Sequence, residues 1–463
     1  MLNNLRKITL IAVGVVLFAG CDGLLDTENS TEVSPDVAQE NIEGIEAILT
    51  SVYNRVQSEW RYGREITLAP DVLADNTEQH PTTSGRYDGQ AVNAQGSHIT
   101  FWNTAYLTIN EANYVIEGAE ITEGVAQEVR DRLKGEALFH RGYAYFDLAR
   151  TYGYEPGREV GGWDQSAIIR TEPTRDVSDA DLRSRSTNAQ VYQQAQTDLE
   201  DALDLLDGND RGLYFANYAA ANALLARLHL YLENWEEAIT YADEAISASG
   251  LTLLDSEDDV ANAFYEVPNP ESILELSIDP VGESLGSNDG LCPYTNPNHW
   301  FDVIPSQNLL NTYDPADYRN SWFTNHTDGF PYTLKWDCST GPFDDNIPLV
   351  RLPEMYLIKA EAHAEEDQLT LALDALEELQ SARGLTVPFV STDKDEIIDE
   401  VMVERRRELN FEGHRWYDLK RRGMDIPKQV GAIMVPYDDF RILSVLPQGE
   451  VDNNPNLEQN PGY

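Results

Sequence analysis

Apolar side chains recur every three or four residues through much of the chain, the spacing that places them on one face of an α-helix. The first such run extends from Ile42 to Val52. After a turn-rich stretch at about residues 71–97, the same spacing predicts helices at residues 102–117, 125–152, 188–206, 215–233, 235–249, 353–366 and 369–384. The pattern therefore predicts a mainly α protein.

Two neighbouring predicted helices within residues 215–249 are similar to a tetratricopeptide repeat, a unit of about 34 residues built from two antiparallel helices. Small side chains such as Ala226 and Ala238 fall where the helices of such a unit cross. An isolated pair leaves one apolar face bare, so several pairs must stack. The sequence therefore predicts tetratricopeptide-like helices at about residues 125–249 and 353–384.

Between about residues 251 and 350 the helical periodicity fails. This stretch is rich in Pro, Gly, Asn and Asp, and it holds three of the eight tryptophans, Trp300, Trp322 and Trp336. Only short runs such as Ser272 to Ile278 are typical of strands. Irregular segments of this length are rare in compact domains unless they are functional. We therefore predict a loop-rich insertion that builds a binding surface.

The first 20 residues are predicted to be a lipoprotein signal peptide. Two basic residues precede an apolar run that is too short to span a bilayer. The sequence Phe18-Ala19-Gly20-Cys21 resembles a bacterial lipobox, in which the cysteine becomes the lipidated N-terminus. The alternative is an ordinary secreted protein in which Cys21 is incidental. Residues 21–35 are polar and turn-rich, as expected of a tether, and residues 36–463 are expected to form one domain.

Charge narrows the possible partners. The chain has 33 Lys and Arg against 80 Asp and Glu, a formal net charge of −47. Because recognition of phosphate relies on an excess of basic residues, a general nucleic-acid binder is excluded. Such a surface also repels anionic lipid, so a lipid anchor must do the tethering. For the same reason a polyanionic glycan is a less expected ligand at low salt.

The remaining cysteines, Cys292 and Cys338, form an even pair in a chain expected to be exported. They are either joined by a disulfide or remain as two buried thiols. The motifs of serine hydrolases, zinc proteases, P-loop enzymes and dinucleotide-binding enzymes are missing from the sequence. We therefore expect no enzyme activity, no cofactor and no metal site.

The C-terminal third carries the most specific pattern. The run Glu404-Arg405-Arg406-Arg407-Glu408-Leu409-Asn410-Phe411-Glu412-Gly413-His414-Arg415-Trp416 resembles the signature block of the SusD/RagB family of outer-membrane nutrient-binding lipoproteins. The stretches at 351–362 and 446–463 are similar to further family blocks, in the family's order. Within the signature block, Glu404 with Arg407 and Arg405 with Glu408 are predicted helical partners. These charges are therefore expected to be structural.

The resemblance implies a SusD-like fold and a function without catalysis. Family members lie lipid-anchored at the cell surface, over a TonB-dependent outer-membrane channel of the SusC type, and deliver captured oligosaccharides to it. This chain is accordingly expected to be a glycan-binding lipoprotein of the outer membrane. The alternatives are a RagB-like lipoprotein that captures peptides and a helical-repeat adaptor without a ligand.

The resemblance also implies where a ligand would bind. Family members draw contacts from the loop after the first helix, here Asp75 and Asn76, from the start of the next helix, here Trp102 and Asn103, and from the central insertion. In the insertion the candidates are Tyr294, Trp300, Trp322 and Trp336. Each has a structural alternative: Trp102 could be core, Asp75 and Asn76 could cap a turn, and Trp322 or Trp336 could fill a gap under the loops. Trp300, which follows Asn296-Pro297-Asn298-His299, is the strongest candidate.

Overall fold

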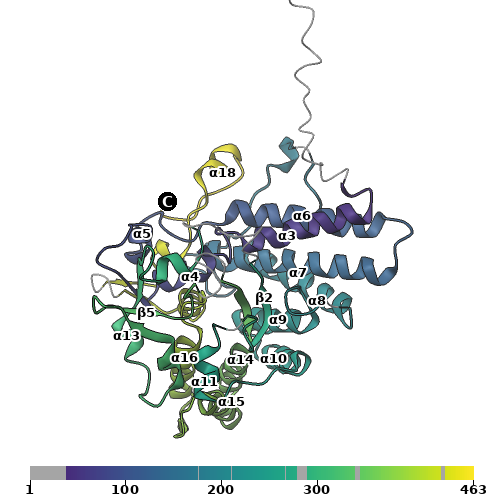
Figure 1. Cartoon of the computed structure of the whole chain (residues 1–463). Helices are drawn as coiled ribbons and strands as arrows, with labels where there is room; N and C mark the ends of the chain where they lie inside the picture. Colours follow the sequence, from purple (N-terminus) through teal and green to yellow (C-terminus); the bar gives the residue numbers. More distant parts are fainter. Residues whose placement is uncertain are drawn as a thin grey trace, which may run out of the picture.

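The computed structural model describes residues 38–175, 177–209, 211–265, 267–278, 289–338, 345–428 and 433–463. The predicted signal peptide, Cys21 and the predicted tether lie outside these residues. Long helices stack on one side of the molecule, and short helices and strands gather on the other (Figure 1). Among the described residues, no helix has both the length and the apolar character needed to cross a bilayer.

The long helices pack in an order that largely follows the chain. α6 packs between α3 and α7, α8 packs between α7 and α9, and α10 packs between α9 and α14. α14 then packs against α15 and α16. The stack consists of α3 (Ile42–Gln57), α6 (Trp102–Ile121), α7 (Gln127–Tyr152), α8 (Asn188–Leu206), α9 (Tyr218–Tyr231), α10 (Trp235–Ser249), α14 (Leu352–Glu365), α15 (Leu369–Ala382) and α16 (Lys394–Leu409).

A glycine permits the close contact between α7 and α8. A Cβ added at Gly142 would lie 3.0 Å from the carbonyl oxygen of Ala195 and 3.0 Å from side-chain atoms of Asp198 and Leu199. That is tighter than ordinary van der Waals contact. Any larger residue at this position would therefore push the two helices apart.

The helical periodicity predicted these elements closely. α8 and α10 begin and end at the predicted residues, while α6 continues to Ile121, beyond its predicted end at residue 117. α9 packs against α10, and α14 packs against α15, as predicted for neighbouring helices of a pair. Their identity as tetratricopeptide repeats stays a prediction.

Eight short strands form four antiparallel pairs in the described residues. The pairs are β1 (Thr77–Gln79) with β3 (Val303–Pro305), β2 (Ser272–Leu276) with β6 (Ile347–Arg351), β4 (Phe323–Asn325) with β5 (Pro331–Thr333), and β7 (Ile426–Pro427) with β8 (Met434–Val435). The β1–β3 pair ties the loop after the first helices to the central insertion. Two regions from which ligand contacts were predicted are therefore held side by side.

Short helices fill the remaining loop-rich part. They are α4 (Glu65–Leu73), α5 (Asp88–Ala91), α11 (Glu257–Asn262), α12 (Cys292–Thr295), α13 (Gln307–Leu310), α17 (Arg415–Arg421) and α18 (Gln448–Asn453), with 3-10 turns η1 (Asp179–Asp181), η2 (Tyr318–Trp322) and η4 (Phe440–Ile442). Several begin with a side-chain cap. At α11, for example, the Ser256 hydroxyl accepts a hydrogen bond from the Asp259 backbone N–H.

A buried ion-pair cluster joins α16 to the insertion and to the stack. Glu408 pairs with Arg319 at 3.1 Å and with Arg351 and Arg383 at 3.0 Å each. All four side chains are buried. Because buried charges are tolerated only when they are paired, these residues, here called the Glu408 cluster, fix the positions of three separate segments.

The cluster corrects one predicted pair. Glu404 and Arg407 are 3.0 Å apart as expected. The predicted pair of Arg405 with Glu408 is wrong, because the Arg405 guanidinium lies 3.0 Å from Asp418 on α17 instead. The expectation that the charges of the signature block are structural is nevertheless consistent with the burial of Arg405 and Glu408.

Candidate functional site

Trp300 projects into solvent because the chain turns sharply beneath it. The backbone N–H groups of Trp300 and Phe301 both donate to the Pro293 carbonyl, at 2.9 and 3.1 Å. Phe301 has a φ of +50°, a left-handed conformation that is uncommon for a bulky residue. The Phe301 ring is thereby buried, whereas the Trp300 side chain is 48% exposed. Backbone strain of this kind often marks a functional site.

The buried Phe301 ring rests on a floor built by distant segments. Its centroid lies 4.4 Å from that of His80, which in turn is 4.8 Å from the ring of Phe330. Asp328 joins two histidines of this floor, with one oxygen 3.1 Å from His80 Nε2 and the other 3.1 Å from His326 Nδ1. The support under Trp300 therefore combines the end of β1 with the β4–β5 hairpin.

Aromatic and guanidinium groups alternate beside this turn. The Arg64 guanidinium carbon lies 5.9 Å from the Trp60 ring centroid and 5.7 Å from that of Tyr294. The Arg86 guanidinium carbon lies 5.2 Å from the Tyr294 ring centroid. Trp60 and Arg86 are exposed, while Arg64 and Tyr294 are buried beneath them. We call Trp60, Arg64, Arg86, Tyr294 and Trp300 the α12 face, because each is linked to that short helix: Tyr294 belongs to it, both arginines lie over the Tyr294 ring, Trp60 lies against Arg64, and the Trp300 N–H donates to Pro293.

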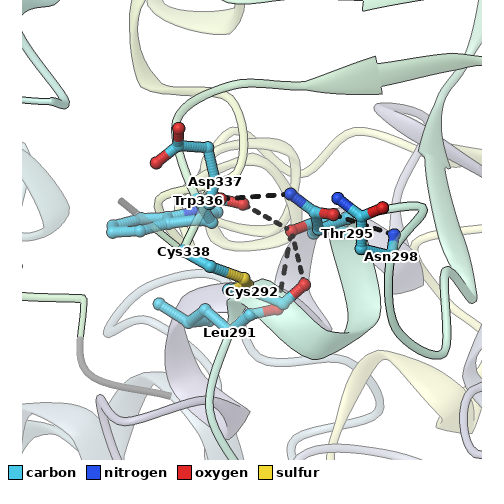
Figure 2. Close-up of a disulfide and its surroundings, with 8 residues drawn as sticks. Leu291, Cys292, Thr295, Asn298, Trp336, Asp337 and Cys338 are labelled. Carbon is cyan, nitrogen blue, oxygen red and sulfur yellow. Dashed lines mark hydrogen bonds between the residues drawn. A yellow bond between two sulfur atoms is a disulfide. The ribbon is translucent and has the colours of Figure 1, made fainter. Parts of the chain in front are cut away.

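A disulfide joins α12 to the segment after β5. Cys292 is bonded to Cys338, with the Cα atoms 5.5 Å apart (Figure 2). The Thr295 hydroxyl donates to the Trp336 carbonyl at 3.2 Å, and the Asn296 amide donates to the Asp337 carbonyl at 3.1 Å. These three links fix the helix from which Tyr294 and Trp300 are held. Of the two alternatives left open by the sequence, the structure has the disulfide.

One group in the described residues brings possible metal ligands together. A ring nitrogen of His299 and the sulfurs of Cys292 and Cys338 lie within 4.8 Å of one another. Because the two sulfurs are bonded to each other, they are not available as thiolate ligands. The disulfide, not a metal ion, accounts for this cluster.

Two predicted ligand tryptophans belong to the core. Trp322 is 2% exposed and donates its indole N–H to the Val260 carbonyl at 2.8 Å. Trp336 is 1% exposed and donates to the Phe411 carbonyl at 2.9 Å. Burial leaves neither ring a free face, so their predicted role in stacking on a ligand is corrected. The structural alternative, that they fill gaps under the loops, holds.

The side chains of Asp75 and Asn76 also form hydrogen bonds within the protein. Asp75 accepts from Arg415 at 2.7 Å, and Asn76 accepts from Arg406 at 2.7 Å while donating to Asp71 at 2.6 Å. Both residues are buried. The expectation that they contact a ligand directly is therefore corrected: they hold the loop between α4 and β1 in place.

Trp102 and Asn103 lie at a different concavity. A groove of about 520 Å³ runs between α6, the loop around residues 168–182 and α18, and its lining includes both residues. Trp102 is buried against Tyr152, with ring centroids 5.0 Å apart, and so belongs to the core, as the structural alternative stated. Asn103 is exposed. The lining of this groove shares no residue with the α12 face.

A buried acid lies next to the α12 face. Burial raises the pKa of Glu65 to about 7, although Arg64, the Thr100 backbone N–H and the Arg86 charge each act to lower it. Its carboxylate is 4.0 Å from the Arg64 guanidinium. Asp289, which pairs with Arg64 at 3.1 Å, is partly exposed. The ion pair of Arg64 is therefore with Asp289, while Glu65, 4.0 Å away, is only partly ionised near neutral pH.

The sequence pattern identified part of this site. Trp300 was predicted as a ligand contact and is exposed. Tyr294 was predicted too, but it is 1% exposed, so its predicted direct contact with a ligand is corrected: its ring lies under the guanidinium groups of Arg64 and Arg86. Trp60 and Arg86 were not predicted. Arg86 lies in a polar run, Ser84-Gly85-Arg86-Tyr87-Asp88, that contains no motif. Only the absence of helical periodicity there could have suggested a surface loop, and nothing in the sequence could place that loop over Tyr294, about two hundred residues further along.

Comparison with known proteins gives one family. Residues 26–230 match a SusD-like family model described as "starch-binding associating with outer membrane", and residues 337–463 match the SusD family model. SusD-like protein P38 of Formosa agariphila is 24% identical over 100% of this chain and 99% of that protein. A SusD-like protein of Bacteroides ovatus is 25% identical over 89% of this chain and 82% of that protein.

Solved structures agree with these matches. The crystal structure of a SusD superfamily protein from Bacteroides thetaiotaomicron superimposes with a TM-score of 0.79 at 26% identity, covering 93% of this chain and 100% of that one. The mainly α, SusD-like fold predicted from the sequence is confirmed. The two family models together cover most of the chain, and the chain belongs to the SusD/RagB family.

Proposed function

We propose that this chain is a glycan-binding lipoprotein of the outer membrane that captures oligosaccharides at the cell surface and delivers them to a SusC-type channel without catalysis. The description of the matched family model, starch-binding and associated with the outer membrane, supports the ligand class and the location. The observation that carries the proposal is Trp300, whose backbone is fixed by its hydrogen bond to Pro293 and whose side chain is 48% exposed.

An exposed indole held in this way suits a sugar. The C–H face of a pyranose stacks on an aromatic ring, and less conformational entropy is lost when the backbone that carries the ring is already fixed. Polar groups at the rim then orient the hydroxyls. The guanidinium of Arg86 supplies several N–H donors beside Tyr294. An affinity in roughly the micromolar range is expected from a few such contacts.

Lipidation at Cys21 supplies the anchor in this proposal. The net charge of −47 disfavours adsorption to anionic headgroups, so the acyl chains must hold the protein at the membrane. Replacing Cys21 with alanine should abolish metabolic palmitate labelling and release the protein from membranes. Continued labelling of the variant would remove this part of the proposal.

The binding proposal is tested with the detergent-purified lipoprotein on a glycan array, followed by calorimetry with the strongest binder. Trp300→Ala should weaken binding by roughly 5-fold to 150-fold, by analogy with about 1–3 kcal/mol per stacked ring. Its melting temperature should change little.

The matched control is Trp235→Ala, which removes the same side chain from α10 in the helical stack. This control should lower the melting temperature yet leave the affinity unchanged. Unchanged binding by Trp300→Ala would contradict the proposal. Binding of peptides in place of glycans would favour the RagB-like alternative.

A further inference from the structure

Arg86 is a cation without an acidic partner in the described part of the chain. Its side chain is exposed, and its guanidinium lies over the Tyr294 ring at 5.2 Å. Arg64, the other arginine of the α12 face, is buried and pairs with Asp289 at 3.1 Å. Arg86 forms no such pair with a described carboxylate. Its N–H donors are therefore open to a ligand.

The acids around Arg86 are engaged elsewhere. Asp289 accepts from Arg64, and Asp88 accepts from Gln79 at 2.7 Å. Asp302 accepts from the backbone N–H of Ser84 at 2.6 Å. Glu65 is buried, and its pKa of about 7 leaves it only partly ionised near neutral pH. No described acid therefore neutralises Arg86 by direct contact.

The net charge of −47 does not override a local contact of this kind. Screening limits the reach of exposed charges to about 8 Å at physiological ionic strength, so distant acids act weakly on a bound ligand. A bidentate contact of arginine with an anionic oxygen pair is made at about 2.8 Å and is among the stronger hydrogen bonds in proteins. The contact with Arg86 should therefore decide the specificity.

We infer that Arg86 binds an anionic group of the glycan, a carboxylate or a sulfate, so that the α12 face selects acidic oligosaccharides. This inference rests on the proposed function and names the ligand class of the same site. The planar fork of arginine matches both groups, whose oxygens are spaced for bidentate contact. In this arrangement the exposed Trp300 ring stacks on the sugar, and the Arg86 guanidinium binds the negatively charged group.

The test begins with an array that carries uronic-acid, sulfated and neutral oligosaccharides, probed with the full-length lipoprotein in detergent. The strongest acidic binder is then compared with its carboxyl-reduced or desulfated form by calorimetry. We expect wild-type protein to bind the acidic form roughly tenfold to hundredfold more tightly, from the strength of hydrogen bonds to charged groups. Which matched pair shows the preference distinguishes a carboxylate from a sulfate.

Two variants isolate the role of Arg86. Arg86→Gln should lose most of the preference for the acidic form and should show a weaker dependence of affinity on salt. Arg183→Gln is the matched control, because it also removes one exposed positive charge, on a loop outside the α12 face. Among the described residues, the Arg183 guanidinium donates only to the Ile169 carbonyl. The control should retain the preference.

The outcomes separate this inference from the proposed function. If no acidic glycan binds, or if Arg86→Gln keeps the preference as fully as Arg183→Gln does, the inference is overturned. Neutral glycans that bind in a Trp300-dependent way would then still support the proposed function. If no glycan of any class binds, both the inference and the proposed function fail.

Discussion

Tryptophan and arginine are placed in opposite ways in two parts of this molecule. Around the Glu408 cluster the arginines are buried in ion pairs. Trp322 lies nearby: its ring centroid is 4.3 Å from the ammonium nitrogen of Lys335, and that ammonium donates to the Glu408 backbone carbonyl. At the α12 face, Trp300 and Arg86 are exposed, although buried partners support them from below. The same residue types therefore serve cohesion in one region and are available for recognition in the other.

The difference lies in whether distant segments of the chain cover the tryptophan ring. Trp322 and Trp300 both follow polar, irregular stretches of the central insertion. The Trp322 indole donates to the Val260 carbonyl and is buried, whereas the Trp300 side chain points outward because the residue that follows it, Phe301, is left-handed. Local sequence cannot distinguish the two cases, because the covering groups come from other parts of the chain.

The largest expected effect is a loss of stability when an ion pair of the buried Glu408 cluster is removed. Glu408→Gln keeps the shape of the side chain but leaves three buried arginines short of a negative partner. We expect a loss of about 3–5 kcal/mol in the free energy of unfolding, measured by urea denaturation. The control is Glu233→Gln in the partly exposed pair with Arg158, where a loss of about 0–1 kcal/mol is expected. Equal losses in the two variants would show that burial does not set the energy.

The next prediction compares two tryptophans directly. Trp336→Ala opens a cavity in the core and should cost about 3–5 kcal/mol of stability. Trp300→Ala removes a ring that is 48% exposed and should cost less than about 1 kcal/mol. Thermal melting of both variants measures this contrast. A loss of stability in Trp300→Ala as large as in Trp336→Ala would mean that Trp300 serves cohesion after all.

Much of the helical stack was predictable, and the reason is local. α8 and α10 match their predicted bounds because the signals are local: a capping box of Thr187 and Gln190 starts α8, and the left-handed Gly250 ends α10. The sequence also indicated that residues 251–350 would be irregular and loop-rich. It could not give the β1–β3 pairing, whose strands lie more than two hundred residues apart.

The candidate site was predictable only in part. Trp300 was the strongest candidate because its neighbours lack apolar periodicity, and the structure places it at the surface. The same reasoning ranked Trp322 next, yet its ring is buried against Phe264 and bonded to the Val260 carbonyl of α11, which no local pattern reveals. Asp75 and Asn76 lie in the predicted loop, but their partners, Arg415 and Arg406, come from the far end of the chain.

The third prediction concerns the link between the two regions. The disulfide of Cys292 with Cys338 closes a segment with a sequence separation of 46 residues. In the chain-entropy treatment, a loop of that length is worth about 3–4 kcal/mol. The double variant Cys292→Ser, Cys338→Ser should therefore melt at a lower temperature. It should also bind glycan more weakly, because α12 loses one of its three links to residues 336–338.

Reducing agent provides the control for this third prediction. It should lower the melting temperature of the wild type toward that of the double variant and leave the double variant unchanged. A wild type that keeps both its melting temperature and its affinity after complete reduction, confirmed by thiol titration, would show that the hydrogen bonds of Thr295 and Asn296 are sufficient to hold the helix.

The two regions also differ in how stability should depend on pH. In the helical stack, burial lowers the pKa of His140 to about 3 from an ordinary 6.5. Its unfolded form therefore binds the extra proton between these values, and stability is lost as pH falls through them. Beside the α12 face, burial raises the pKa of Glu65 to about 7 from an ordinary 4.5. Here the folded form binds the extra proton, and stability is lost as pH rises from about 4.5 to 7.

The smallest expected effect isolates Glu65. Glu65→Gln mimics the protonated acid, so its stability relative to the wild type should increase as pH rises from 4.5 to 7 and level off above pH 7. We expect a total difference of about 3 kcal/mol, since the pKa of Glu65 rises from 4.5 to about 7 and each unit is worth about 1.4 kcal/mol. Melting temperatures of both proteins across pH 4 to 8 give the difference curve, in which the titration of His140 and other groups cancels. A difference that stays constant across this range would show that the pKa of Glu65 is the same in the folded and unfolded protein, so that burial does not raise it.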